Sequence, residues 1–225
     1  MSKEQEKQLA AQASLDLVRD GYIVGLGSGS TADYFIRLLG ERVRAGLKII
    51  GIPASFRTRD LAAENRIPLA TLDDYQELDV TIDGADEFNP SLNLIKGGGG
   101  ALLMEKILAA ASKKFVVITD SSKQVEVLGN SPLPVEVIPQ AQAILTKKLT
   151  ALGALVQLRQ YTFGNPFITE EGHQILDCLF GEIPDPAGLA SKLDTMPGVV
   201  EHGLFLGMAD VLLMAKGSDV VEFKR

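Results

Sequence analysis

The chain has 225 residues, of which 46% are hydrophobic and 23% are charged. It can therefore bury a core, and this composition excludes both a disordered chain and a collagen-like repeat. With 22 lysines and arginines against 29 aspartates and glutamates, the net charge is −7, which disfavours nucleic acid or an anionic membrane as the main partner. An anionic small molecule is still compatible, because a few backbone N–H groups and one or two lysines can hold a phosphate.

Cysteine and histidine are scarce in this chain. Cys178 is the single cysteine, so no intrachain disulfide can form, and the two histidines are His173 and His202. A zinc site would need both histidines and a carboxylate, and we therefore expect no metal. The start of the chain lacks the pattern of a secretory signal, and no run of about 18 apolar residues could span a bilayer. We expect a soluble protein of the reducing cytoplasm.

Helical and strand patterns alternate along the first half of the chain. Apolar residues at helical spacing predict a helix over 3–19, which ends before Gly21. The elements predicted after it are strand 22–26, helix 32–44, strand 48–52, helix 57–65, a short strand near 68–72, strand 79–82, helix 101–111 and strand 115–119. Because the strands are nearly continuous in apolar residues, this alternation predicts a parallel sheet covered by helices on both faces.

The order of elements changes near 129–134, where Gly, Asn, Ser and Pro gather. The elements predicted beyond this point are strand 135–138, helix 141–152, strand 155–160, strand 174–179, helix 188–194 and strand 199–205. Their βαββαβ order is the split βαβ, ferredoxin-like pattern.

Two last strands, 210–215 and 220–223, are expected to return to the first sheet, so the smaller domain is an insert. The predicted fold class is α/β, a Rossmann-like parallel-sheet domain with an inserted ferredoxin-like α+β domain. The first domain is predicted to comprise 1–130 and 206–225, and the second 131–205.

A glycine-rich turn, Gly25–Thr31, joins the first predicted strand to the next helix. Its exposed N–H groups and the helix dipole favour an anion. The turn differs from a dinucleotide loop, because Ser30 stands at the third glycine position and no acidic residue follows the second strand. A P-loop is ruled out, since no Gly-Lys-Ser/Thr sequence is present. The turn fits a phosphate monoester, and the alternative is a tight turn in which Ser or Thr caps the helix.

Three carboxylates lie in Asp83–Glu87, at the end of an apolar strand. Ligands of open α/β sheets bind at the carboxyl ends of strands. A calcium loop is excluded, because Ala85 and Leu94 stand where ligands are needed. Neighbouring acids repel one another unless they are solvated or differ in protonation. We therefore favour a functional role over an acidic turn with Asx-type hydrogen bonds.

The segment Lys96–Gly100 contains four consecutive glycines. Such a run is entropically costly in a compact fold, and it is explained if backbone N–H groups must approach a ligand closely just before a helix starts. A flexible linker is the alternative, but the tract lies between a predicted strand end and an apolar helix.

Glu105 lies on that apolar helix. Its neighbours at helical spacing are Ala101, Leu102, Leu108 and Ala109. A solvated Glu-Lys pair is the alternative reading, whereas a carboxylate partly withdrawn from water serves as a general base. Together the four segments suggest a sugar-phosphate pocket.

Several segments resemble those of the A-type ribose-5-phosphate isomerases. They are Val24–Ala32, Asp83–Glu87, Lys96–Leu102, Asp120–Lys123, Pro134–Pro139 and Pro197–Val200. Their order and spacing match the family over essentially the full length of the chain. The resemblance implies interconversion of D-ribose 5-phosphate and D-ribulose 5-phosphate in the pentose phosphate pathway, with no metal or organic cofactor.

The resemblance also implies residue roles. Glu105 would move a proton between C1 and C2 through a cis-enediolate. Asp83, Asp86 and Lys96 would line the reacting end and assist ring opening. The implied substrate-binding residues are Ser28, Gly29, Ser30, Thr31, Asp83, Gly84, Ala85, Asp86, Lys96, Gly97, Gly98, Gly99 and Lys123. The family further implies a homodimer or homotetramer, with the contact expected on the small domain, and neither nucleic acid nor a membrane as partner.

The chain departs from the usual family pattern at three positions, none of which removes a catalytic group. Ser28 stands where threonine is common, Met104 where an arginine often stands, and Gly100 where many members have alanine.

Two other protein classes share some of these features. A coenzyme A transferase-like enzyme uses a glutamate nucleophile on related architecture. A sugar-phosphate-sensing binding protein should carry a basic DNA-binding module, for which this chain has neither room nor charge. The roles of Lys7, His173, His202 and Cys178 stay open.

Overall fold

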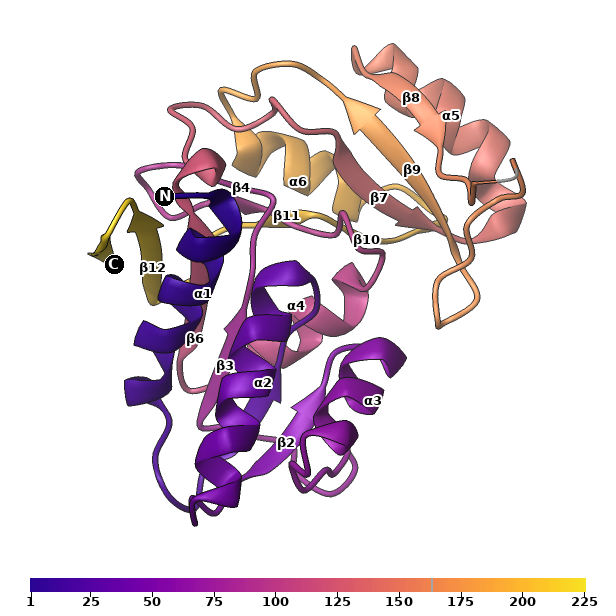
Figure 1. The fold of residues 1–225 in the computed structure, drawn as a ribbon. Helices are drawn as coiled ribbons and strands as arrows, with labels where there is room; N and C mark the ends of the chain where they lie inside the picture. The colour runs from indigo at the N-terminus through magenta and orange to yellow at the C-terminus, as the bar shows by residue number, and fades with distance from the viewer. Residues whose placement is uncertain (163) are drawn as a thin grey trace. The chain divides into compact units, whose positions relative to one another are not determined.

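The computed structural model describes residues 1–162 and 164–225 (Figure 1). Its packing separates two units, which we call the large unit and the small unit. The large unit comprises Met1–Ala85, Met104–Lys123 and Gly207–Arg225, and the small unit comprises Asp86–Leu103 and Gln124–Leu206. The predicted domain division, with limits at 130, 131, 205 and 206, stays a prediction.

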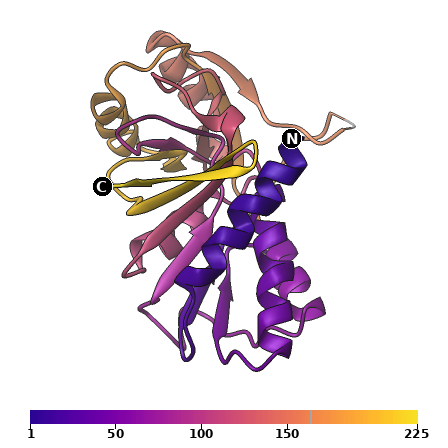
Figure 2. The same cartoon turned by 60° about the vertical axis from the view of Figure 1, so that its left-hand side comes forward.

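Short apolar runs form the sheet of the large unit. Its strands are β1 (Ile23–Leu26), β2 (Ile50–Pro53), β3 (Val80–Asp83), β6 (Phe115–Asp120), β12 (Val211–Lys216) and β13 (Asp219–Lys224). They follow the order β13-β12-β6-β3-β1-β2, and all neighbours are parallel except β12 and β13. The hairpin of β12 and β13 is the yellow pair of arrows in Figure 2. The expected parallel sheet, and the return of the last two strands to it, are confirmed.

Helices cover both faces of this sheet. They are α1 (Lys3–Ser14), α2 (Ser30–Arg44), α3 (Phe56–Glu64) and α4 (Leu102–Ala110), with short 3₁₀ turns at Leu15–Leu17 and Ser121–Lys123. One face packs Val24 and Val80 against the fully buried Phe35 of α2, and Figure 1 shows α1 and α2 in front of the strands. On the other face, Leu108 of α4 packs with Ile52. Alternate strand residues serve the two faces because side chains alternate along a strand.

The prediction of a short strand near 68–72 is wrong. Only one residue of it, Leu69, bridges β2, at Gly51, with hydrogen bonds from Gly51 N to Pro68 O and from Ala70 N to Gly51 O. Pro68 has no N–H to donate, and β2 ends at Pro53, so the ladder cannot extend in either direction. β2 is therefore the last strand at this edge of the sheet.

The small unit contains the predicted βαββαβ order. Its elements are β7 (Leu133–Val137), a 3₁₀ turn (Pro139–Ala141), α5 (Gln142–Ala151), β8 (Leu155–Leu158), β9 (Gln174–Leu179), α6 (Pro186–Asp194) and β10 (Val199–His202). The strands form an antiparallel sheet in the order β10-β7-β9-β8. Leu145 of α5 and Leu193 of α6 pack with Leu176 of β9 in its core. This arrangement confirms the ferredoxin-like fold class.

The strand predicted over 199–205 is two strands, because the chain changes sheet at Gly203. Beyond it, β11 (Leu204–Phe205) pairs with β5 (Leu94–Ile95), which pairs in turn with β4 (Glu87–Phe88). Gly203 N donates to Pro134 O at 2.8 Å, and Gly203 O accepts from Lys96 N at 2.9 Å. A Cβ at this position would overlap the Lys96 carbonyl, so glycine is needed where the backbones approach.

The histidines and the cysteine have structural partners in the small unit. His202 is 4% exposed and its Nε2 lies 3.0 Å from Asp194 Oδ1, while His173 Nδ1 lies 2.9 Å from the buried Glu136 carboxylate. Cys178 is fully buried in β9, and burial raises the pKa of its thiol to about 12. Across the described part of the chain, no helix is both long and apolar enough to cross a membrane.

Candidate active site

Close packing explains two glycines of the Gly25–Thr31 turn. A Cβ at Gly25 would overlap the Thr81 hydroxyl, and a Cβ at Gly27 would overlap the Asp83 carboxylate. Both contacts bring β1 against β3, where Asp83 is fully buried. Asp83 Oδ1 accepts hydrogen bonds from Ser28 N at 3.0 Å and Gly84 N at 2.7 Å. The structure therefore joins the first two predicted segments directly.

The start of α2 presents backbone donors. Its N-cap, Gly29, has φ +108° and provides no capping side chain, and the first helical hydrogen bond runs from Asp33 N to Gly29 O. The N–H groups before Asp33 have no acceptor within the helix, which makes this end a place for an anion. Thr31 Cβ lies 3.9 Å from where a Cβ on Gly84 would stand, so both segments border the helix start.

Ser55 and Thr58 support this turn and were missed by the sequence analysis. Ser55 Oγ lies 3.2 Å from Ser28 Oγ and accepts from Thr58 N, as the N-cap of α3. Thr58 Oγ1 donates to Gly27 O at 2.9 Å. The signal was present as a serine, a favoured N-cap residue, just before the predicted helix 57–65.

The three carboxylates of the segment Asp83–Glu87 have different hydrogen-bond partners and different roles. Glu87 is 2% exposed and its carboxylate accepts hydrogen bonds from Gly129 N, at 2.8 Å, and from Ser131 N. It therefore holds a loop of the small unit. Asp86 is half-buried and accepts from Gly98 N at 2.8 Å. Asp83 and Asp86 thus each bind a glycine-rich segment through a backbone N–H.

The tract Lys96–Gly100 is a tight turn that follows β5. Gly100 N donates to Gly97 O at 3.0 Å, and both residues have positive φ, +103° at Gly97 and +87° at Gly100. Gly98 and Gly99 are exposed, whereas Lys96 is 2% exposed with Nζ 5.4 Å from the Phe205 ring centroid. A buried ammonium beside an exposed glycine turn is a group of donors suited to an oxyanion.

Glu105 is buried in the first turns of α4. Its side chain is 3% exposed, and Leu108 and Ala109, which share its helix face, are buried too. The structure therefore does not support a solvated Glu-Lys pair. A carboxylate held out of bulk water on a rigid helix suits proton transfer.

Lys123 ends the 3₁₀ turn Ser121–Lys123. Glu6 of α1 fixes this turn by accepting hydrogen bonds from Ser121 N at 3.0 Å, Ser121 Oγ at 2.8 Å and Gly217 N at 2.8 Å. The backbone hydrogen bonds from Gly217 and Ser121 lower the pKa of Glu6 below its ordinary value. Sequence reasoning missed Glu6, because its partners lie more than 100 residues away.

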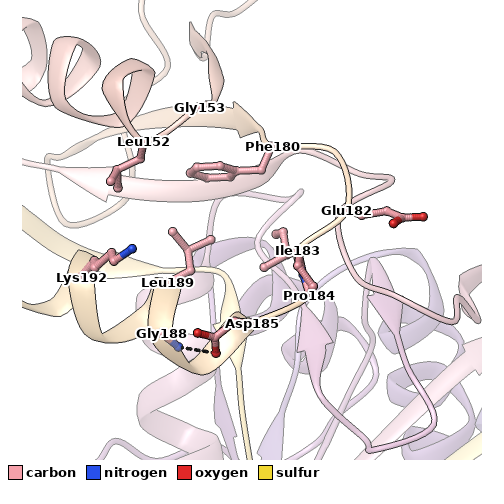
Figure 3. A pocket seen from close by; sticks show the side chains of 10 residues that line it. All are labelled: Leu152, Gly153, Phe180, Glu182, Ile183, Pro184, Asp185, Gly188, Leu189 and Lys192. Carbon is pink, nitrogen blue, oxygen red and sulfur yellow. Dashed lines mark hydrogen bonds between the residues drawn. The ribbon is translucent and has the colours of Figure 1, made fainter.

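A cavity of about 290 Å³ lies in the small unit between the ends of α5 and β9 and the start of α6. Figure 3 shows Leu152, Phe180 and Leu189 pointing toward one another in it. The Asp185 carboxylate is engaged as the N-cap of α6, with Gly188 N donating at 2.9 Å. None of the residues predicted for the site lines this cavity.

The fold and these groups define a class of protein. The chain combines a parallel α/β sheet, a turn at β1 suited to an anion, carboxylates at a strand end and a buried glutamate on a helix. This combination is typical of an enzyme that acts on a small anionic substrate. Among the described residues, no three His, Cys, Asp or Glu side chains form a group that could hold a metal ion.

Comparison with known proteins identifies the family. The model of the family "Ribose 5-phosphate isomerase A (phosphoriboisomerase A)" matches residues 50–219. The chain is 54% identical to ribose-5-phosphate isomerase A of Afipia carboxidovorans, over 96% of this chain and 94% of that protein. It is 48% identical to the Parvibaculum lavamentivorans protein of the same name, over 99% and 100%.

Solved structures agree with this match. A D-ribose-5-phosphate isomerase in complex with phospho-erythronic acid is 41% identical, with a TM-score of 0.97 and full coverage of both chains. The ribose 5-phosphate isomerase A of Methanocaldococcus jannaschii is 42% identical with a TM-score of 0.95, again with full coverage. The chain belongs to the ribose 5-phosphate isomerase A family and is an isomerase. These matches do not favour a coenzyme A transferase or a sugar-phosphate sensor.

Proposed function

We propose that this isomerase interconverts D-ribose 5-phosphate and D-ribulose 5-phosphate, with Glu105 as the base. The observation that carries the assignment is the buried Glu105 carboxylate, 3% exposed on α4. From aldose to ketose, Glu105 removes the proton from C2, which leaves a cis-enediolate with its negative charge on O1. A proton then passes from O2 to O1, and Glu105 returns its proton to C1 as O2 becomes the ketone oxygen. A positioned base contributes about 10²–10⁴-fold to such a step.

We propose that the start of α2 binds the phosphate. Gly29, Ser30 and Thr31 would provide N–H donors, Ser28, Ser30 and Thr31 would provide hydroxyl donors, and Lys123 would add a positive charge. The helix dipole supports this role, as do the N–H groups of the first turn, which have no acceptor within the helix and no capping side chain at Gly29. The hydrogen-bonded series Ser28, Ser55 and Thr58 keeps the donors in place, so little order is lost when the phosphate binds.

The carboxylates and the lysine would act on the sugar. Asp83 and Asp86 would hold hydroxyl groups and assist ring opening, with Gly84 and Ala85 beside them. Lys96 and the N–H groups of Gly97 and Gly99 would stabilise the negative charge of the enediolate oxygen, while the Gly98 N–H holds Asp86 in place beside the substrate. One preorganised donor of this kind contributes about 10²–10³-fold. Phospho-erythronic acid, found with a relative, presents a planar carboxylate where the enediolate has two oxygens, and we expect this chain to bind it.

The assembly and location are also proposals. We propose a homodimer or homotetramer that works in the cytoplasm, in the pentose phosphate pathway. The exposed apolar side chains of Ile144 and Leu155, at 56% and 74%, support a contact through the small unit. Light scattering at micromolar concentration tests this, and a monomer would contradict it.

The decisive experiment measures isomerisation by the purified protein in EDTA. Steady formation of a ketopentose phosphate from ribose 5-phosphate is expected, together with deuterium uptake from D₂O into the product. Glu105→Gln should retain substrate binding and lose about 10²–10⁴-fold in kcat, with the exchange lost in parallel. Glu64→Gln, an exposed glutamate at the end of α3, is the control. Near-normal kcat in Glu105→Gln would exclude Glu105 as the base.

A further inference from the structure

The guanidinium of Arg159 bridges a carboxylate and the glycine tract of the small unit. Arg159 follows β8, and its Nε and Nη2 donate to Asp177 Oδ2 and Oδ1 at 2.9 and 2.5 Å. On the other edge, Nη1 donates to the carbonyl oxygens of Gly97 and Gly98 at 2.9 and 3.2 Å. The side chain is 14% exposed. Only a planar group with several fixed donors can serve two acceptors on each edge.

Arg159 and Asp86 hold the same peptide group at opposite ends. The Gly97 carbonyl accepts from Arg159, while the N–H of that peptide group belongs to Gly98 and donates to Asp86. A trans peptide is planar, with its C=O and N–H pointing in opposite directions. These two contacts therefore fix the orientation of the peptide plane. In the next peptide group the Gly98 carbonyl points to Arg159, so the Gly99 N–H points away from it.

The tract depends on such outside support because glycine has little conformational preference of its own. The turn bond from Gly100 N to Gly97 O closes the tract but leaves the middle peptide groups free to rotate. Two carbonyl oxygens that face the same point repel each other, and a cation between them removes that repulsion. Arg159 is therefore the group that makes this conformation of the tract favourable.

Phe167 completes the support on the same side. Its N–H donates to Arg159 O at 2.8 Å, and its ring centroid lies 5.9 Å from the guanidinium carbon. A Cβ at Gly100 would overlap the same ring. Arg159 and Phe167 thus contact the tract at both its middle and its end.

We propose that Arg159 is a positioning residue for the isomerisation. It touches Gly97 and Gly98 and orients their peptide groups, so that the Gly98 N–H meets Asp86 and the Gly99 N–H points away from the guanidinium. It acts on the reaction only through these groups, with Asp177 aligning its guanidinium. The inference rests on the proposed function, in which the Gly99 N–H stabilises the enediolate and Asp86 holds sugar hydroxyl groups. It predicts that loss of the arginine lowers kcat more than it raises KM, because the donors serve the transition state.

Arg159→Ala and Arg159→Lys test the proposal. For Arg159→Ala we expect kcat to fall about 10²-fold, the cost of small displacements of reacting groups, with KM for ribose 5-phosphate changed by less than about threefold. Arg159→Lys keeps the charge but cannot hold Asp177 and two carbonyls together, so an intermediate loss is expected. Asp177→Asn keeps the shape and removes the aligning charge, and should lower kcat in the same way but less.

Hydrogen exchange of the Gly98 N–H, followed by NMR, provides a reading that does not depend on turnover. Faster exchange at Gly98 is expected in Arg159→Lys, with the core N–H groups of β9 unchanged. Leu145→Ala is the control for stability, because Leu145 of α5 is fully buried in the core of the same unit and is not one of the residues assigned to the site. It should lower the unfolding midpoint and leave kcat unaltered.

Several outcomes would overturn the inference. They are wild-type kcat in Arg159→Lys and Asp177→Asn, a fall in kcat that Leu145→Ala reproduces at equal stability, or unchanged Gly98 exchange despite lower kcat. If Arg159→Ala does not fold, the lysine and asparagine variants decide. If the wild-type protein itself does not convert ribose 5-phosphate, the proposed function fails. Conversion by the wild type with Glu105→Gln inactive and Arg159 variants fully active refutes the role of Arg159 alone.

Discussion

Two glycine-rich segments of this chain each donate a backbone N–H to a carboxylate, and one of them is also held by a cation. In the large unit, the Asp83 carboxylate holds the turn at Gly27, because Asp83 Oδ1 accepts a hydrogen bond from Ser28 N. The same carboxylate leaves no room for a side chain at Gly27. In the small unit, a cation holds the tract by its carbonyl oxygens, through Arg159. In the first segment the charged partner binds a backbone donor, whereas the second segment has charged partners at a donor, Gly98 N, and at two acceptors.

The two segments contain glycine for two different physical reasons. At Gly25 and Gly27 the residue is small because side chains of β3 occupy the space, so a substitution there affects folding. At Gly99 nothing lies within 4 Å of an added Cβ, so packing does not require glycine there. Glycine at this position instead leaves the backbone N–H accessible to a ligand. We expect the first segment to respond in stability and the second in turnover.

The largest effect is expected at Gly27. In Gly27→Ala the new methyl group meets the Asp83 carboxylate, and overpacking in such a rigid place costs about 1–3 kcal/mol. Urea unfolding measures the loss. Gly84→Ala, where the nearest atoms lie 3.9 Å from an added Cβ, is the control and should change stability by less than about 0.5 kcal/mol. Equal stability of the two variants would remove the distinction drawn for the large unit.

Gly98→Ala should act on turnover. The added Cβ would lie 2.9 Å from Asp86 Oδ1, so the carboxylate must move and its hydrogen bond from Gly98 N is lost. We expect kcat/KM to fall about 10–10²-fold with little change in the unfolding midpoint. Gly188→Ala is the matched steric control, because an added Cβ there also meets a carboxylate, that of Asp185, which accepts from Gly188 N; it lies outside the predicted site and should leave kcat/KM unchanged. A Gly98 variant that unfolds early but turns over normally would show that the tract, too, is structural.

A smaller effect is expected at Ser55. Ser55→Ala removes the N-cap of α3 and the contact with Ser28 Oγ, at a cost of about 1 kcal/mol, and should raise KM severalfold. Ser2→Ala, which removes the N-cap of α1, should cost similar stability without altering KM. If both variants behave alike in KM, the hydroxyl series has no part in substrate binding.

The smallest effect is a difference in pH dependence between the two units. Hydrogen bonds from Gly217 and Ser121 lower the pKa of Glu6, so Glu6 adds stability above pH 4.5 that is lost as pH falls through its folded pKa. Burial raises the pKa of Glu136, despite its hydrogen bonds from His173 and Thr169. Its contribution is therefore greatest below pH 4.5 and declines as pH rises toward its folded pKa.

Paired variants measure these opposite signs. Glu6→Gln should be less stable than the wild type at pH 7 and approach it in acid. Glu136→Gln should match the wild type in acid and gain on it as pH rises above 4.5. Urea unfolding midpoints between pH 3 and 7 provide both comparisons, and the same sign for the two variants would contradict the assigned pKa directions.

Elements with a strong period could be predicted from the sequence, and those fixed by distant contacts could not. The tract Lys96–Gly100 and the helix with Glu105 were found because composition and spacing are local signals. The strand near 68–72 was predicted from apolar residues, but Pro68 and Pro53 end the ladder. The break at Gly203 follows from the approach of Lys96, which lies far away in the sequence.

The same limit applies to the site. The carboxylates at the end of β3 were recognised, yet nothing in Asp83–Glu87 shows that Glu87 holds Gly129 and Ser131. Arg159 and Asp177 are polar residues in ordinary strand surroundings, and their importance arises only because the guanidinium reaches Gly97, 62 residues earlier. Ser55 was within reach, since a capping pattern is local.

The buried thiol has a practical consequence. Cys178 lies next to Asp177 in β9, with no exposed surface and a pKa of about 12, and it is the single cysteine. Alkylation requires the thiolate to attack the reagent, so the folded chain should resist alkylation and need no reductant. The rate at which Cys178 is labelled then measures how often β9 becomes exposed by local unfolding of the small-unit sheet, without any engineered cysteine.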